Sequence, residues 1–172
     1  MKSMKIIAMT LITISFLTLM VSNDSIAHSN ESKKHRIYPK GSGAETDAGK
    51  AITEFHKALK LGNKKKVRSL LDDSVTIFEG GGVEKSADEY ASHHMMTDMK
   101  YLAKVKTEVL THSVKVIGDM AYSMSRTKST GQVSMKYINA EGMETMVLKK
   151  KNNTWKIVHI HWSKYGAYPY SF

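Results

Sequence analysis

Histidines and carboxylates at short spacings are the residues of this chain best suited to chemistry. His94 and Asp98 are four residues apart in a segment expected to be helical, so both project from one face about one turn apart. Tyr90 and several apolar residues share that face, which predicts that it points inward. A neutral imidazole oriented by a carboxylate suits proton transfer near neutral pH. His94 and Asp98 are therefore the candidate catalytic residues.

A second pair of histidines lies near the end of the chain. His159 and His161 alternate in a predicted strand and are expected to share an inward face with Trp155 and Ile157. The opposite face would carry three apolar residues that suit a dimer interface, namely Val158, Ile160 and Trp162.

Glu79 precedes a glycine-rich turn and is expected near the mouth of a pocket that Tyr90, His159 and His161 also line. Three interpretations stay open. In one, the pocket uses acid–base catalysis to isomerise, hydrate or hydrolyse a small apolar molecule. In the second, a divalent metal, zinc or copper, is held by four ligands, Glu79, His94, Asp98 and His161. In the third, the same groups only hydrogen-bond one another in a polar core.

Three other histidines carry less information. His93 lies about 100° around the helix from His94 and is expected to be exposed. His56 and His112 are isolated in the sequence and are expected to be surface or packing residues.

The first 27 residues have the pattern of a cleavable signal peptide. Lys2 and Lys5 precede an apolar run at 6–21, and small residues, Ser25 and Ala27, follow it. The run is shorter than the ~20 residues that cross a bilayer, so no stable membrane anchor is expected after cleavage behind Ala27. The mature protein is expected to be periplasmic or secreted in a bacterium. The chain has no cysteine, so disulfides cannot stabilise it.

The charge of the chain suits an anionic partner, but its pattern does not indicate nucleic acid. The full chain has a formal charge of +10, and the signal peptide removes two lysines and one aspartate, which leaves +9. The lysine clusters stand at three separate positions, 33–34, 64–66 and 149–151. No arginine-rich or aromatic nucleic-acid motif accompanies them, so nucleic-acid binding is not expected.

The mature chain is long enough for one domain of the α+β class. Residues 28–43 are polar and are predicted to form a flexible leader, followed by a domain at 44–165 and an aromatic tail at 166–172. Helical spacing is found at 45–61, 63–71 and 86–102. The segments rich in β-formers then follow at 104–117, 120–129, 133–138, 144–150 and 155–163. Helices followed by antiparallel strands predict helices on one face of a curved sheet.

Three stretches of the chain resemble a known superfamily. They are "ALKLGNKKKVRSLLDDSVTIFEGGG", "SADEYASHHMMTDMKYL" and "GMETMVLKKKNNTWKIVHIHWS". They are similar to SnoaL-like and ketosteroid-isomerase-like proteins of the nuclear transport factor 2-like superfamily, and most similar to the bacterial domain of unknown function 4440. The resemblance covers residues 46–163.

This resemblance implies a cone-shaped, curved antiparallel sheet wrapped around three N-terminal helices, the cystatin-like or nuclear transport factor 2-like fold. It also implies a pocket at the open end and a homodimer packed through the outer face of the sheet. It does not imply one activity, because the superfamily includes enzymes of several kinds and proteins without catalysis. The aspartate base and the tyrosine–aspartate pair of the steroid isomerases are not matched to positions of this sequence.

Overall fold

The structure is a computed structural model that describes residues 41–165. The predicted signal peptide, leader residues 28–40 and the tail 166–172 lie outside the described residues. The helices are α1 (Asp47–Lys60), α2 (Lys64–Leu70), α3 (Ala87–Ser92) and α4 (Met95–Lys104). The strands are β1 (Leu71–Glu79), β2 (Gly82–Glu84), β3 (Val105–Ile117), β4 (Met120–Val133), β5 (Lys136–Lys151) and β6 (Thr154–Tyr165). No helix within residues 41–165 is long and apolar enough to span a membrane.

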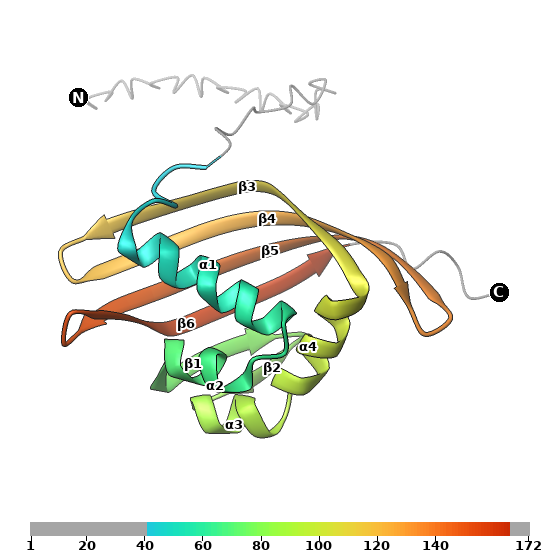
Figure 1. Ribbon diagram of the computed structural model, residues 1–172, viewed down its shortest axis with the longest axis horizontal. Coiled ribbons are helices and arrows are strands. Elements are labelled where there is room, and N and C mark those ends of the chain that lie inside the picture. The colour runs from blue at the N-terminus through green and yellow to red at the C-terminus, as the bar shows by residue number, and fades with distance from the viewer. Residues whose placement is uncertain (1–40, 166–172) are drawn as a thin grey trace, which may run out of the picture. The chain divides into compact units, whose positions relative to one another are not determined.

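The six strands form one curved, unclosed sheet in the order β2-β1-β6-β5-β4-β3, and α1 crosses its concave face (Figure 1). The predicted α+β class and the curved sheet are confirmed. The sheet is not wholly antiparallel, however, because β1 pairs with β6 in the parallel direction. Four strands and two helices lie between β1 and β6 in the chain. Because no short hairpin joins β1 to β6, these two strands can run in the same direction.

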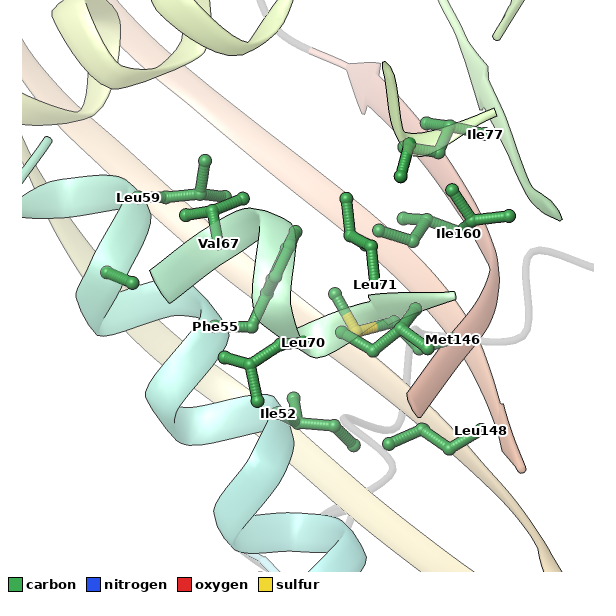
Figure 2. Close-up of a cluster of buried hydrophobic side chains, with 14 of the residues drawn as sticks. Ile52, Phe55, Leu59, Val67, Leu70, Leu71, Ile77, Met146, Leu148 and Ile160 are labelled. Atoms are coloured by element: carbon green, nitrogen blue, oxygen red, sulfur yellow. The ribbon is translucent and has the colours of Figure 1, made fainter. Parts of the chain in front are cut away.

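The first helix begins and ends where its sequence favours it. The Thr46 hydroxyl accepts a hydrogen bond from the Gly49 N–H at 3.1 Å, which satisfies one of the free N–H groups at the start of α1. Gly62, just beyond the C-terminal end of α1, has a φ of 70°, the left-handed conformation in which glycine commonly ends a helix. The buried face of α1 meets residues of α2, β1, β5 and β6 in one apolar cluster (Figure 2). Each fully buried large aliphatic side chain there contributes about 1.5–3 kcal/mol relative to an exposed one.

The predicted third helix is two helices in the structure. Ser86 caps α3, since its Oγ accepts a hydrogen bond from the Glu89 N–H at 3.0 Å. The backbone leaves the helical region at His93, where φ is −108° and ψ is −86°, and α4 begins after His94. The Asp98 N–H still donates to the His94 carbonyl at 3.0 Å. The expected one-turn spacing of His94 and Asp98 therefore survives the break.

Strands β4 and β5 are longer than the predicted strand segments, because they continue through Gly131 and Gly142. The chain reverses at Ser134, which has a φ of 56°. A Cβ atom added to Gly131 would lie 2.8 Å from the Lys104 carbonyl oxygen. A Cβ atom added to Gly142 would lie 2.9 Å from Thr127 Oγ1. These glycines permit close approach of neighbouring groups rather than a turn.

A β-bulge in the last strand changes which residues face inward. His159 pairs with Val147, whereas Ile157 pairs with Leu148, so Val158 is an extra residue in β6. Because side chains alternate along a strand, one extra residue exchanges the two faces for everything beyond it.

The inward face expected for the last strand is therefore wrong beyond Ile157. Ile160 has no exposed surface, and the Trp162 indole also lies on the inner side, where it contacts Phe55 of α1. His159 and His161 lie on the outer side, where both rings contact Phe78. Ile160 packs in the core of its own chain and Trp162 faces inward, so neither lies on the outer face expected for a dimer contact.

The folded part of the chain starts slightly before the expected Ala44. The Ser42 carbonyl accepts a hydrogen bond from the Val114 N–H at 2.7 Å, and Ser42 forms a bridge to Ser113 of β3. Gly43 has a φ of 77°, and a Cβ atom there would lie 2.2 Å from the Val114 carbonyl oxygen. Only glycine fits this crossing, so the last residues of the predicted leader belong to the domain.

Candidate functional site

A small cavity of about 10 Å³, large enough for about one water molecule, lies where β1, β2, α3 and α4 meet. Its polar lining comes from Glu79, Glu84, Tyr90 and His94. Asp98 binds the Tyr90 hydroxyl and completes the group. We call these five residues the rim cluster. Four of them are residues that the sequence singled out, and Glu84 is the fifth.

Glu84 is the buried carboxylate of the rim cluster, with 6% of its side chain exposed. One of its oxygens is hydrogen-bonded to His94 Nδ1, and the other lies 3.3 Å from His93 Nδ1. This hydrogen bond raises the pKa of the His94 imidazole. With Nδ1 bound to Glu84, the Nε2 atom of His94 remains available, and 57% of that side chain is exposed.

Tyr90 and Asp98 form the second pair of the rim cluster. The Tyr90 side chain is fully buried, and its hydroxyl donates a hydrogen bond to Asp98 Oδ2 at 2.9 Å. Burial raises the pKa of the Asp98 carboxyl, and burial together with the Asp98 charge raises the pKa of Tyr90. A tyrosine–aspartate pair is thus present, although the sequence could not identify one.

Glu79 ends β1 with a half-buried side chain beside this pair. Burial and then the nearby Asp98 charge raise the pKa of the Glu79 carboxyl. Among residues 41–165 no hydrogen bond or ion pair to the Glu79 carboxylate is found, so its oxygens are free to meet a ligand. A carboxyl group with a raised pKa suits proton transfer near neutral pH.

A second group of polar residues lies on the concave side of the sheet. Glu144 has three partners: Trp162 Nε1 donates to one oxygen at 2.7 Å, while Ser125 Oγ and His56 Nε2 lie 3.3 and 3.2 Å from the other. We call His56, Ser125, Glu144 and Trp162 the interior cluster. Its carboxylate is as buried as Glu84, but its oxygens are occupied by donors from α1, β4 and β6.

Two polar groups on the same side of the sheet lack a hydrogen-bond partner within residues 41–165. His112 Nε2 and Ser123 Oγ are both buried without a hydrogen bond. Burial lowers the pKa of the His112 imidazole, which keeps the ring neutral. Buried groups of this kind are usually satisfied by water.

Trp162 connects the two clusters through its ring. The indole stacks on Phe55 with a centroid separation of 6.4 Å and lies 6.1 Å from the ring of Tyr90. Its N–H meanwhile reaches Glu144. This one residue therefore contacts Tyr90 of the rim cluster with its ring and Glu144 of the interior cluster with its N–H.

The structure brings together only part of the predicted site. Glu79, Tyr90, His94 and Asp98 lie in one cluster, but the side chains of His94 and Asp98 bond different partners, Glu84 and Tyr90, rather than each other. His159 and His161 are on the other side of the sheet, where His159 Nδ1 lies 2.8 Å from the Thr76 carbonyl oxygen. They cannot line the same cavity, so the expected pocket and metal set are corrected at these positions.

Sequence reasoning missed the buried carboxylates of both clusters. Glu144 alternates with Met146 and Leu148 along β5, and this alternation alone could have placed it on the inner face. His56 follows Phe55 in α1 and contacts Glu144 from 88 positions away, which no local pattern reveals. Glu84 lies in a strand of three residues, too short for a periodic signal.

Two of the three lysine clusters meet in space although they are far apart in sequence. Lys65 of α2 and Lys151 of β5 line one open groove of about 610 Å³ together with Arg68 and Lys156. Lys151 is paired with Asp72, and Arg68 with Asp73 and Asp88. Two of the four cationic side chains of the groove, Arg68 and Lys151, are therefore paired with carboxylates.

Comparisons with known proteins identify the fold of this chain. The family model for the calcium/calmodulin dependent protein kinase II association domain matches residues 45–166. A crystal structure described as a "putative ketosteroid isomerase" from Shewanella frigidimarina is 42% identical, with a TM-score of 0.70, and covers 72% of this chain and 99% of its own. No curated protein matches.

More distant structures share the fold. The CaMKII hub of S. rosetta is 22% identical with a TM-score of 0.60, and the match covers 72% of this chain and 98% of the hub. An NTF2-like protein of unknown function from Pseudomonas putida is 17% identical with a TM-score of 0.60, covering 70% and 85%. The predicted nuclear transport factor 2-like superfamily is confirmed. Membership of the domain of unknown function 4440 group stays a prediction.

Proposed function

The chain belongs to the calcium/calmodulin dependent protein kinase II association domain family, and from this premise we propose that it is an exported, homo-oligomeric domain whose rim cluster transfers protons on a small molecule. The observation that carries the catalytic part is the arrangement of Glu79. Its unpaired carboxyl has a raised pKa and lies at the same cavity as the buried Tyr90, which is bonded to Asp98.

The proposed reaction is an isomerisation of an unsaturated ketone. Glu79 removes a proton from the carbon between the carbonyl group and the double bond, and the electron pair moves onto the carbonyl oxygen. Once Asp98 is protonated, it no longer needs the Tyr90 hydrogen, and either Asp98 or Tyr90 can donate a hydrogen bond to that oxygen, because a carboxylic acid kept neutral by burial can serve as a donor. The proton then returns to the far carbon of the double bond, so that the substrate and product have the same composition.

The exposed side of the rim cluster is where a substrate would lie. The cavity holds about one water molecule, so only the reacting end of a ligand reaches Glu79. His94, bound to Glu84 and more than half exposed, is positioned to contact the rest of the ligand. The 42% identical relative with a ketosteroid isomerase description supports this reaction class.

The test uses two β,γ-unsaturated ketones of different size, cyclohex-3-enone and a Δ5-3-ketosteroid. Formation of the conjugated enone is followed by absorbance. Glu79→Gln is expected to lower kcat by about 10²–10⁴-fold, the usual contribution of a general base. Glu54→Gln, a matched change at an exposed ion pair on α1, is expected to leave kcat within about twofold. Turnover that does not depend on Glu79, or its absence with both ketones, contradicts the catalytic proposal.

The proposed homo-oligomer rests on the outer face of the sheet. Phe78, Met124 and Met143 on that face are between 40% and 52% exposed, although they are large and apolar. Relatives described as an association domain and a hub support self-association. Light scattering should give a mass above that of one chain, and Met124→Lys should lower it. A wild-type monomer would contradict this part of the proposal.

Export is tested separately from catalysis. Expression of the full chain in a bacterium, followed by N-terminal sequencing of the periplasmic and secreted fractions, is expected to yield a chain that starts at His28. Retention of uncleaved protein in the cytoplasm would contradict it.

A further inference from the structure

Three potential metal ligands lie at the junction of β2 and α3, and one of them, Glu84, also belongs to the rim cluster. They are Glu84, Glu89 and His93, and one ligand atom from each lies within 4.8 Å of the other two. Glu89 and His93 are one turn apart, since the His93 N–H donates to the Glu89 carbonyl at 3.0 Å. Glu84 comes from the neighbouring strand β2. Two elements and only ten residues of sequence therefore supply the whole set.

The local backbone already holds Glu89 in place. Its side-chain oxygen Oε2 accepts a hydrogen bond from the Lys85 N–H at 2.6 Å, while the Glu89 N–H donates to Ser86 Oγ. This reciprocal pairing at the start of α3 restricts the rotamer of Glu89 without using its second oxygen. A ligand oriented before the metal arrives loses less entropy on binding.

The two oxygens of Glu84 have separate roles. One is bonded to His94 Nδ1, and the other faces His93 Nδ1 at 3.3 Å. A cation that binds the second oxygen and His93 Nδ1 replaces only the contact between these two atoms. The His94 bond remains as outer-shell support that fixes the carboxylate, an arrangement that strengthens metal binding.

The donor set determines which cation fits. One imidazole and two carboxylates, with no thiolate, match the ligands of Zn²⁺ in sites that leave a coordination position to water. His93 is 60% exposed, so solvent can supply that position. Mg²⁺ and Ca²⁺ prefer all-oxygen ligands, which makes them poorer matches.

We propose that Glu84, Glu89 and His93 bind one Zn²⁺ ion and thereby tie β2 to α3. This set shares no residue with the one predicted from the sequence, which was Glu79, His94, Asp98 and His161. The site does not rest on the proposed proton transfer, whose acceptor, Glu79, is not among the ligands.

The experiment uses the full chain, freed of metal with EDTA and then titrated with zinc sulfate in a calorimeter. One Zn²⁺ per chain is expected, with a higher Tm in the presence of zinc because the ion binds only the folded chain. His93→Ala and Glu89→Gln are expected to weaken binding by at least about 100-fold, the upper range for loss of an outer-shell partner.

His161→Ala is the matched control, because it removes an imidazole from the outer face of the sheet. It should leave the affinity within about twofold. Thermal unfolding of every variant in EDTA verifies that the variants are folded, and both His93 and Glu89 are exposed enough for substitution. The proposal is overturned by three results: no zinc binding, equal affinity in the wild type and His93→Ala, or loss of the site in His161→Ala. Neither the affinity nor the Tm depends on turnover, so failure here is distinct from failure of the ketone assay.

Discussion

The interior and rim clusters use the same kinds of residue in opposite ways. In the interior cluster, the buried Glu144 is bonded by donors from three different elements, and Trp162 covers it. In the rim cluster, the buried Glu84 is bonded by histidines that are more than half exposed, and no such partner of Glu79 is found in the described part of the chain, residues 41–165. A carboxylate saturated by donors stabilises the fold, whereas one with free or exposed neighbours is available to a ligand.

The interior cluster should show the largest loss of stability on mutation. Glu144→Ala removes the acceptor for the Trp162 N–H and leaves it buried without a partner. We expect the free energy of unfolding in urea to fall by about 3 kcal/mol, in the range for breaking a buried polar network. His161→Ala, on the outer face, should cost less than about 0.5 kcal/mol. A loss below about 1 kcal/mol for Glu144→Ala would show that the interior cluster is not structural.

A single donor of the interior cluster can be removed while its ring stays aromatic. Trp162→Phe deletes the N–H that donates to Glu144, and Trp155→Phe makes the same change at a buried tryptophan for which no hydrogen bond is found within residues 41–165. We expect Trp162→Phe to cost about 1–2 kcal/mol more than its control. Equal losses from the two variants, measured by urea denaturation, would show that ring volume rather than the hydrogen bond matters.

Asp72, in the groove lined by lysines of α2 and β5, is a further carboxylate whose contribution to stability should depend on pH. Its hydrogen bond from Lys151, and then that from Ser74, lower its pKa to about 2. Because the folded-state pKa is depressed, the stability it contributes is present above the unfolded-state pKa and is lost as pH falls toward 2.

Asp72→Asn should therefore lower the free energy of unfolding in urea by about 1 kcal/mol at pH 7. The difference between the variant and the wild type should vanish near pH 2. Asp119→Asn, at an exposed turn, is the control and should change little at either pH. A loss that persists unchanged in acid would assign the effect to packing and not to the charge of Asp72.

The smallest effect on stability is expected for a mutation of Glu79 in the rim cluster. This mutation should raise the free energy of unfolding, whereas the mutations above should lower it. The folded-state pKa of Glu79 is raised, so the folded chain binds more protons than the unfolded chain between the two pKa values, and stability falls as pH rises through this window. Glu79→Gln removes the charge and should stabilise the protein at pH 7 by less than about 1 kcal/mol. The gain should disappear at pH 4. If Glu79→Gln instead destabilised the protein at pH 7, the Glu79 carboxylate would be one that stabilises the fold, as Glu144 does.

Much of the fold follows from local patterns that the sequence displays openly. Thr46 and Ser86 cap α1 and α3 through hydrogen bonds between residues three apart, which is a purely local relation. The one-turn relation of His94 and Asp98 is also local, and it persists even though the predicted helix is broken between Ser92 and Met95. The superfamily was recognisable from its motifs, and the curved sheet under α1 agrees with it (Figure 1).

The rim and interior clusters depend on contacts between distant parts of the chain, which no local sequence pattern reveals. The extra residue Val158 exchanged the faces of β6, and a bulge of this kind leaves no mark in an alternating apolar sequence. His56 met Glu144 only through the packing of α1 on the sheet. By itself, therefore, the sequence determined the α+β class, the helix starts and a group of residues near the rim. Only the tertiary structure decided which carboxylates are saturated, because long-range contacts depend on register and packing rather than on spacing along the chain.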